Sequence, residues 1–476
     1  MKKKSIKKNY IYNLTYQLLS VIIPLITTPY LSRVLGASGI GIYSFASSVV
    51  TYFVLFATLG TATYGQREIS YVQDNREKRT EVFWNTEFLS CISTFIILFF
   101  YTLYVIFFSG NVVIYTIFSM NIIFVVFDIT WLYRGMEEFG QIVFRNIFFK
   151  IVNVVLIFLV VQTEDDIGKY VLIMCLLPLL GVMSLWSSLF KIVDKPDWKK
   201  IKPFTNINVV LSMFIPTIAI SIYTVLDKTM LGVLTGLNVE NGYYEQALKL
   251  SRTALSLVTA LGTVIIPRIG YHYEKKETEI VRNYMYRSYR FVWFLGIPLS
   301  LGMIAVAPNV VPWFYGDGFD KVIPLLGISS LLIIAIGINN VTGMQYLIPT
   351  RRQNVFTYTV LIGAVTNFIL NFILIPKWYS VGAAFASVLA ETVIAVVQII
   401  IVRKEISPWK ILSYSRHYLV AGFVMYGILK KIGHYLEAGI LNSMMMIIGG
   451  GVIYFLILLI LKDDFFKEQI VKILKR

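Results

Sequence analysis

The stretch "NGYYEQALKLSRTALSLVTALGTVIIP", residues 241–267, is apolar enough after its first few residues to cross a membrane. It nevertheless contains Glu245, Lys249 and Arg252. A charged side chain at the middle of a membrane helix costs about 2.5–3.5 kcal/mol, so such a side chain is expected to face protein or water rather than lipid. The stretch therefore predicts a membrane helix with one face turned to a polar environment.

The three charges belong to a longer polar stripe. Ser256, Thr259 and Thr263 continue it at steps of three or four residues, which places all six side chains on one helix face. Stripes with similar spacing occur in three other apolar stretches: Asn13, Gln17, Ser20 and Thr27; Ser44, Ser48, Thr51 and Thr58; and Thr217, Ser221, Thr224 and Lys228. We interpret the four helices as the lining of one water-filled cavity. Small hydroxyl residues also gather where membrane helices pack together, and this alternative stays open for the two N-terminal stripes.

The composition is that of a membrane protein. Of the 476 residues, 57% are hydrophobic and only 15% are charged, and the mean hydropathy is +0.70. The formal net charge of +16 could indicate a nucleic-acid-binding protein. The distribution of the basic residues along the chain argues against that, because they gather in short segments between apolar stretches.

Fourteen stretches are long and apolar enough to be membrane spans: residues 9–33, 40–64, 81–108, 112–133, 142–161, 170–190, 207–235, 241–267, 291–314, 322–348, 355–375, 381–402, 417–431 and 441–461. Alternate connecting segments with their edges, beginning with the N-terminus, contain 33 of the 43 Lys and Arg residues, and the opposite segments with their edges contain five. Because cytoplasmic loops are rich in basic residues, we expect an even number of spans with both termini in the cytoplasm. The predicted fold is an all-α polytopic membrane protein of about fourteen helices.

An internal repeat predicts two lobes. "GIYSFASSVVTYFVLFATLGT", residues 41–61, and "GYYEQALKLSRTALSLVTALGT", residues 242–263, both open Gly-x-Tyr and end Leu-Gly-Thr. They fall on the second and eighth spans, which would cross the membrane in the same direction. Two six-helix lobes with a binding site between them are a common plan of transporters. We therefore predict an N-lobe in residues 1–206 and a C-lobe in 207–403; residues 404–476 then hold two further helices and an amphipathic cytoplasmic tail.

The cavity between these lobes is predicted to be cationic. Its predicted substrate-binding residues are Arg33, Lys228, Lys249, Arg252, Asn13, Gln17, Ser48, Thr51 and Ser256. Four of them are basic, whereas the same region contains two acids, Asp227 and Glu245. A net positive cavity suits an anionic ligand, because a guanidinium group can form two hydrogen bonds to phosphate oxygens.

Four acidic residues in predicted spans, Asp227, Glu245, Glu391 and Asp128, could either couple transport to an ion or have a structural role. Asp227 and Glu245 could form structural ion pairs with neighbouring lysines, and Asp128 could pair with an arginine at the membrane surface. Glu391 could be a protonatable coupling residue or a buried group that hydrogen-bonds a neighbouring helix, and the second interpretation is favoured. No metal site is expected from three scattered histidines and two cysteines.

The chain is not expected to be an enzyme. It contains no phosphate-binding GxxxxGK[ST] loop, so no built-in ATP hydrolysis is indicated. The loops on the outer side, such as "TGLNVEN" and "YGDGF", are too short to hold a catalytic domain. A membrane-bound polymerase or glycosyltransferase would need a larger outer loop with acid and base residues.

Several segments resemble one family of transporters. "NLTYQLLSVIIPLITTPYLSRVLGASGIGIYSFASSVVTYFVLFATLGTATYGQREIS", "DITWLYRGMEEFGQIVFRN", "VLDKTMLG" and "VTNFILNFILIPKWYSVGAAFASVLAE" are similar to polysaccharide-repeat flippases of the Wzx type. These belong to the multidrug/oligosaccharidyl-lipid/polysaccharide exporter superfamily. The resemblance implies translocation of an undecaprenyl-pyrophosphate-linked oligosaccharide through a cationic cavity of a fourteen-helix protein, for capsule or exopolysaccharide biosynthesis.

The resemblance leaves the substrate and the energy source open. A teichoic acid precursor or lipid II are alternative substrates, and a multidrug cation antiporter is disfavoured because its site should be net acidic. No cofactor is expected, and a proton gradient, a sodium gradient or the membrane potential could drive transport. The expected location is the bacterial cytoplasmic membrane, with membrane lipids and the lipid-linked oligosaccharide as partners. We expect a monomer that could work beside a polysaccharide polymerase, and no nucleic-acid partner.

Overall fold

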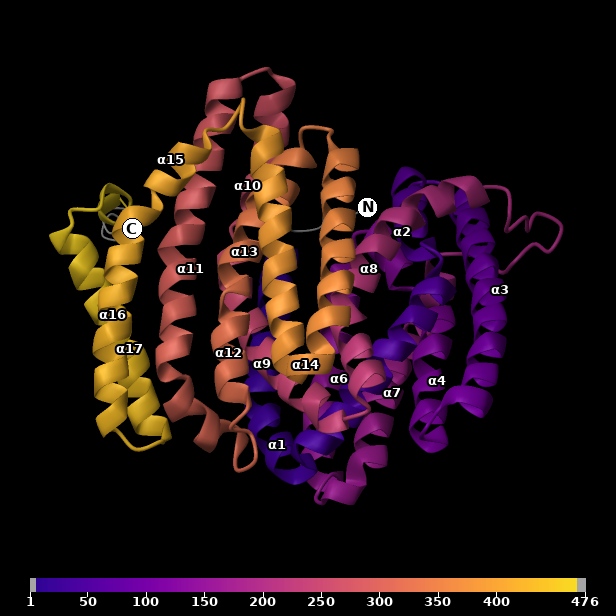
Figure 1. Cartoon of the computed structure of the whole chain (residues 1–476). Helices are drawn as coiled ribbons and strands as arrows, with labels where there is room; N and C mark the ends of the chain where they lie inside the picture. Colours follow the sequence, from indigo (N-terminus) through magenta and orange to yellow (C-terminus); the bar gives the residue numbers. More distant parts are fainter. Residues whose placement is uncertain (1–5, 469–476) are drawn as a thin grey trace. The chain divides into compact units, whose positions relative to one another are not determined.

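The computed structural model describes residues 6–468, without the side chains of residues 6–18, 20, 21, 215, 216, 219, 220, 222, 223 and 263. Every regular element in the described range is a helix (Figure 1). An unpaired backbone group is costly in lipid, and a helix satisfies its N–H and C=O groups within one segment, so apolar stretches of this length become helices. The predicted all-α fold is confirmed.

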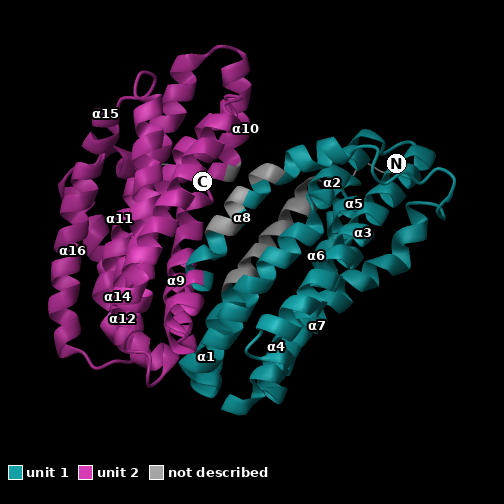
Figure 2. Cartoon of the chain, turned by 45° about the vertical axis from the view of Figure 1, so that its right-hand side comes forward, with its two compact units in different colours: residues 1–229 teal, residues 230–476 magenta. Residues whose placement is uncertain are grey.

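The chain divides into two compact units, residues 1–229 and 230–476 (Figure 2). The helices of unit 1 are α1 (Ile6–Thr58), α2 (Thr61–Tyr71), α3 (Arg76–Phe108), α4 (Val112–Phe127), α5 (Thr130–Gly135), α6 (Phe139–Val160), η1 (Glu164–Asp166), α7 (Ile167–Met183), η2 (Ser184–Lys191) and most of α8 (Ile207–Thr235). Those of unit 2 are α9 (Asn238–Thr259), α10 (Gly262–Glu274), α11 (Thr278–Tyr315), α12 (Val322–Ser330), α13 (Leu332–Asn339), the π-helix η3 (Asn340–Leu347), α14 (Gln353–Val402), α15 (Pro408–Ser413), α16 (Ser415–Tyr435) and α17 (Ile440–Ile460). The lobe boundaries predicted at residues 206 and 403 stay predictions.

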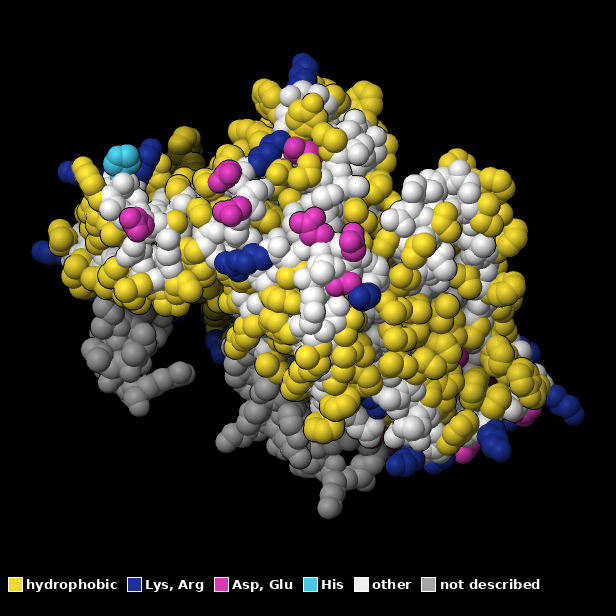
Figure 3. All heavy atoms as spheres, turned by 90° about the horizontal axis from the view of Figure 1, so that it is seen from below, with side chains coloured by type: hydrophobic (Ala, Val, Ile, Leu, Met, Phe, Trp, Pro, Cys, Tyr) yellow, Lys and Arg dark blue, Asp and Glu magenta, His cyan; other side chains and the backbone are white. Residues whose placement is uncertain are grey.

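Each of the fourteen predicted spans falls mainly on helical residues, with short breaks inside some of them, such as Leu59–Gly60 and Asp128–Ile129. In the described part, nine helices are long and apolar enough to cross a membrane, or ten if the bent pair Asn238–Thr259 and Val264–Glu274 forms one span. Two of the nine, Ile22–Tyr71 and Gln353–Val402, are 50 residues long. The second includes the predicted spans 355–375 and 381–402, and the first includes span 40–64 and the second half of span 9–33. Hydrophobic side chains form much of the surface seen in Figure 3, as expected for a protein in contact with lipid. The chain is a multi-pass membrane protein.

A glycine break precedes each of the two repeated segments, residues 41–61 and 242–263. Gly36 interrupts α1 with φ 63° and ψ 179°, and Gly236 lies between α8 and α9 with φ 65°. Glycine adopts this left-handed region without the steric cost that a Cβ atom brings. The helix that contains each repeated segment ends in a threonine, Thr58 or Thr259, and a short helix follows, α2 or α10. The local layout thus repeats at the two segments that the sequence repeat relates.

The break in α14 has a different origin. Tyr379 has φ 52° and ψ −130°, a conformation that costs a non-glycine residue about 1–3 kcal/mol. The chain turns back so closely here that a Cβ atom on Gly382 would lie 2.4 Å from the carbonyl oxygen of Leu374. Glycine at position 382 is therefore required by this turn.

A buried carboxylate stabilises this turn. Glu240, 6% exposed near the start of α9, accepts hydrogen bonds at Oε2 from the Ser380 backbone N–H (3.1 Å) and hydroxyl (2.5 Å). Its Oε1 forms a 2.5 Å ion pair with Lys321, whose ammonium group also lies 5.3 Å from the centre of the Tyr379 ring. Glu240 thus joins α9, the start of α12 and the two halves of α14.

Segments that the charge pattern assigns to one side of the membrane meet in space within each unit. In unit 1, Arg76 pairs with Asp194 at 3.0 Å, and the Gln73 amide donates to the Gly135 carbonyl at 2.7 Å. Buried Arg79 donates to the Ile192 carbonyl at 2.9 Å. These contacts join residues 65–80, 134–145 and 191–206, and they agree with the predicted alternation of the loops.

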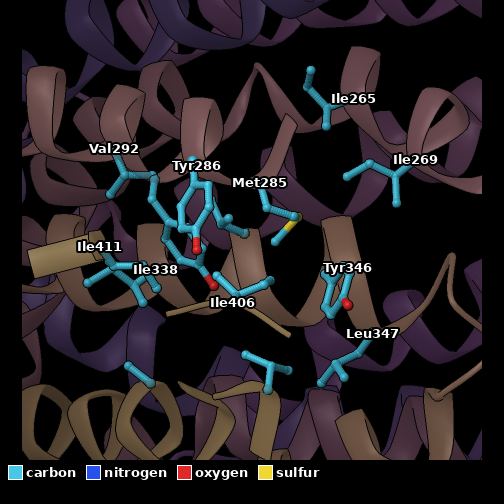
Figure 4. Close-up of a cluster of buried hydrophobic side chains, with 14 of the residues drawn as sticks. Ile265, Ile269, Met285, Tyr286, Val292, Ile338, Tyr346, Leu347, Ile406 and Ile411 are labelled. Carbon is cyan, nitrogen blue, oxygen red and sulfur yellow. The ribbon is translucent and has the colours of Figure 1, made fainter. Parts of the chain in front are cut away.

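Unit 2 repeats this arrangement at its corresponding end. Arg351 pairs with Glu274 at 2.8 Å, and the Arg352 guanidinium donates to both carboxylate oxygens of Glu405 at 2.9 and 2.7 Å. The Tyr346 hydroxyl also donates to Glu405. Tyr346 belongs to a hydrophobic cluster that includes Ile269, Met285, Tyr286, Ile406 and Ile411 (Figure 4). The basic loops are therefore packed parts of unit 2. Which end faces the cytoplasm stays a prediction.

Replacement of Glu240 by alanine is expected to destabilise the protein. The change leaves the Lys321 ammonium group and the Ser380 N–H without their acceptor, and removal of one partner from a buried pair typically costs about 3–5 kcal/mol. The apparent melting temperature of the purified protein in detergent should fall by several degrees.

The matched control for this experiment is Glu274→Ala, which also removes one carboxylate from an ion pair. The side chains of Glu274 and Arg351 are 63% and 76% exposed, and an exposed pair contributes about 0–1 kcal/mol. Equal melting temperatures of the two variants would contradict a stabilising role for Glu240.

Candidate substrate-binding site

Helix α9 has a buried face and an opposite polar face. Tyr244, Ala247, Leu248, Ser251 and Val258 are buried, and α9 packs against α12 and α13. The Tyr244 hydroxyl lies 2.9 Å from the Ser387 hydroxyl of α14. This face of α9 therefore belongs to the interior of unit 2.

The polar stripe lies on the other side of α9. Arg252 and Ser256 are exposed, whereas Glu245, Lys249 and Thr259 are half-buried. Glu245 and Lys249 each have an interaction partner. Arg252 has no carboxylate within ion-pair distance among the described residues. Thr263, at the end of the stripe, lies outside the described side chains. The face thus offers an exposed guanidinium group beside a half-buried ammonium group.

Unit 1 contains the other predicted cavity cations. Arg33 is exposed just before the Gly36 break, and its guanidinium donates to the Pro29 carbonyl at 3.0 Å. Lys228 and its neighbour Asp227 are half-buried near the end of α8, and both have interaction partners. That Arg33 and Lys228 line the same cavity as Lys249 and Arg252 stays a prediction.

The hydroxyl stripe of unit 1 lies partly in a helix–helix contact. Ser48 is 3% exposed; its hydroxyl donates to the Phe45 carbonyl at 2.7 Å and accepts from the Thr229 hydroxyl of α8 at 3.0 Å. Thr51 is half-buried and donates to the Ser47 carbonyl at 2.7 Å. This is the geometry of two packed helices, the alternative that the sequence left open. A ligand role for Ser48 and Thr51 stays a prediction.

Two further predicted residues, Asn13 and Gln17, lie outside the described side chains, since α1 is described there by its backbone alone. The last residue of the stripe on α9, Ser256, donates to the Thr253 carbonyl at 2.7 Å and is otherwise exposed.

Glu391 and Asp128 both have local structural partners. Glu391, 9% exposed in α14, accepts hydrogen bonds from the Asn339 amide at its carboxylate and, at 3.0 Å, at its backbone carbonyl. Asp128 follows α4, and its Oδ1 accepts from the Thr130 N–H at 3.0 Å. Glu391 thus joins α14 to α13, and Asp128 stabilises the turn between α4 and α5. A coupling role for either residue stays a prediction.

The sequence did not single out two buried charged residues. Glu240 was assigned to an outer loop, and its partners Lys321 and Ser380 are 81 and 140 residues away in the chain. Arg79, 8% exposed, was counted with the basic residues of a cytoplasmic loop. Charge counting groups residues by loop, and neither residue has a local pattern that would indicate burial.

Comparison with known proteins identifies the family. Residues 6–272, more than half of the chain, match the family model described as "Polysaccharide biosynthesis protein". A candidate O-antigen transporter of Escherichia coli (strain K12) is 25% identical over 419 residues, which cover 85% of this chain and 98% of that protein. A candidate flippase of Haloferax volcanii, AglR, is 24% identical over 46% of each chain.

Solved structures of transporters have the same fold. The lipid II flippase MurJ, in an inward closed conformation, superposes with a TM-score of 0.73 over 97% of this chain and 100% of its own, at 16% identity. An inward-facing multidrug resistance MATE family transporter of the MOP superfamily has a TM-score of 0.57 over 86% of this chain and 99% of its own, at 14% identity. These relatives and neighbours are named as transporters and flippases rather than enzymes, and the chain belongs to the polysaccharide biosynthesis protein family.

Proposed function

We propose that this chain is a flippase that moves an undecaprenyl-pyrophosphate-linked oligosaccharide across the bacterial cytoplasmic membrane for surface polysaccharide biosynthesis. The family and the transporter fold support this class of function. The names of the relatives, an O-antigen transporter and a flippase, point to a glycan substrate. The observation that carries the proposal is the cationic face of α9.

Charges on α9 need a polar environment. Arg252 is exposed and Lys249 half-buried on the face of α9 opposite to its buried residues. Lipid is an unfavourable solvent for both groups, so water or a polar ligand is their expected environment. In a flippase with alternating access, this face would line the passage through which the headgroup crosses.

The chemistry of the stripe matches a pyrophosphate linked to sugars. Lys249 supplies a compact positive charge and Arg252 a planar pair of donors, and both groups bind phosphate oxygens. Arg33 and Lys228 would add positive charge from unit 1. Asn13, Gln17, Thr51 and Ser256 would hydrogen-bond sugar hydroxyls, whereas the lipid chain would stay in the bilayer.

Loss of either α9 cation is expected to impair transport without loss of the protein. A charge-assisted hydrogen bond contributes about 1.5–3 kcal/mol, so Lys249→Ala and Arg252→Ala should each slow flipping about 10- to 100-fold. The measurement is surface polymer in a flippase-deficient strain, normalised to the amount of inserted protein. Arg252→Lys, which keeps the charge, should retain more activity than Arg252→Ala.

The control for the transport assay is Arg351→Ala, which removes one exposed cation from a loop. It should transport like the wild type. Wild-type export by both Lys249→Ala and Arg252→Ala would overturn the assignment of α9 to the substrate passage. Resistance to organic cations upon overexpression, without polymer export, would instead favour a multidrug antiporter.

The proposed topology, with both termini in the cytoplasm, can be tested by single cysteines in a background without Cys91 and Cys175. Four exposed positions offer two matched pairs. Asp165→Cys and Glu437→Cys should react in intact cells with a maleimide that does not cross membranes, because their loops are predicted to lie outside. Lys199→Cys and Lys404→Cys should react only after the cells are opened, and the reverse pattern would contradict the proposed orientation.

A further inference from the structure

A second cationic pocket lies in unit 2, apart from the face of α9. Its volume is about 270 Å³, and its walls come from α11, from Tyr414 between α15 and α16, and from the segment after α17. Arg287 and Arg290, three residues apart on α11, supply its positive charge. All three wall segments belong to loops that the charge pattern assigns to the cytoplasmic side.

Arg290 is fixed in this pocket by a buried network. Its Nη2 pairs with Asp463 Oδ2 at 2.8 Å, and its Nε donates to the Tyr418 hydroxyl at 2.8 Å. Asp463 is 1% exposed. Burial would raise the pKa of its carboxyl, but hydrogen bonds from the Phe466 N–H and the Arg290 guanidinium outweigh burial and lower that pKa. Asp463 is therefore a permanent counter-ion of Arg290 at neutral pH.

Arg287 has a more exposed partner. Its Nη2 contacts Glu468 Oε1, and the two side chains are 56% and 39% exposed. An exposed ion pair contributes about 0–1 kcal/mol, so another anion can replace Glu468 at little cost. The pocket thus combines one immobilised guanidinium group with one whose partner is exchangeable.

The pocket favours an anion over a zwitterion with a cationic end. Its aromatic walls already contact cations of the protein: Arg290 lies 5.4 Å from the centre of the Tyr414 ring and 5.3 Å from that of Phe465, and Lys410 lies 4.3 Å from that of Tyr286. Two cations of the pocket walls, Arg287 and Arg290, face two carboxylates, Glu468 in the wall and the buried Asp463. The local charge is therefore balanced and becomes +1 when Glu468 moves away. A choline group would have to compete with these cations for the aromatic rings.

We propose that this pocket binds the phosphate group of an anionic membrane lipid, with the phosphate oxygens replacing Glu468 on Arg287. Two guanidinium groups on one helix face suit the tetrahedral oxygens of a phosphate. The cytoplasmic leaflet, toward which these loops are predicted to lie, attracts basic groups through its anionic lipids. The pocket is separate from the α9 face, and the proposal does not depend on the transported substrate.

The test measures lipid binding to the full-length protein purified in a neutral detergent. Native mass spectrometry with phosphatidylglycerol should show one tightly retained lipid on the wild type. Arg287→Gln should weaken retention about tenfold, because a charge-assisted hydrogen bond is lost. Glu468→Gln should strengthen retention about threefold, because a competing carboxylate is lost. Arg287 is the better target because replacement of Arg290 leaves the buried Asp463 without its partner.

The matched control is Arg282→Gln, which removes another exposed arginine of α11, one paired with Glu279 and absent from the pocket walls. It should retain phosphatidylglycerol like the wild type, and phosphatidylcholine should bind to all variants equally weakly. Equal retention by wild type, Arg287→Gln and Glu468→Gln would overturn the proposal. Stabilisation by inorganic phosphate without retained phosphatidylglycerol would assign the pocket to a soluble ion and overturn the lipid assignment.

Discussion

The low polarity of the bilayer is the constraint on which this structure depends. A backbone group or a charged side chain without a partner is costly in that environment. Long apolar stretches therefore become helices, and charges within or beside them have partners or face water. Glu240, Asp463 and Arg79 follow this rule inside the two units, since each meets donors or acceptors of other segments. The exposed cation of α9 meets no carboxylate in the described part of the chain, which is why it is the candidate for ligand binding.

The same rule separates structural from functional polar residues. Glu391 receives two hydrogen bonds from Asn339, and Ser48 bonds both its own helix and α8. Groups that are satisfied in this way contribute to helix packing and have less capacity left for a substrate. Arg252 and Ser256, exposed on α9, keep that capacity. The cationic face of α9 and the Arg287 pocket thus differ from the interior in two ways. Their arginines are more exposed to solvent, and the interactions that these arginines make within the protein are weaker.

Most of the architecture could be predicted from the sequence because it follows from additive properties. The hydropathy of a span and the number of Lys and Arg residues in a loop can be calculated without knowledge of distant contacts. The first predicts the helices, and the second predicts the alternation of the loops. Gly36 and Gly236 lie in the gaps between predicted spans, 9–33 and 40–64 in one case and 207–235 and 241–267 in the other. The backbone conformation of Tyr379 could not be anticipated, because it depends on Glu240 and Lys321, which belong to other loops. The hydroxyl stripes were ambiguous because serine and threonine serve both helix contacts and water-filled cavities.

The Arg290–Asp463 pair also has a consequence for the order of assembly. Arg290 enters the chain 173 residues before Asp463, and Arg287 precedes Glu468 by 181 residues. During synthesis from the N-terminus, both arginines must wait for the last membrane helix before they meet their counter-ions. The end of unit 2 that holds them is therefore completed only after residue 468 has been made, so a truncated product that ends before α17 carries two arginines without these counter-ions, which a quality-control protease can recognise.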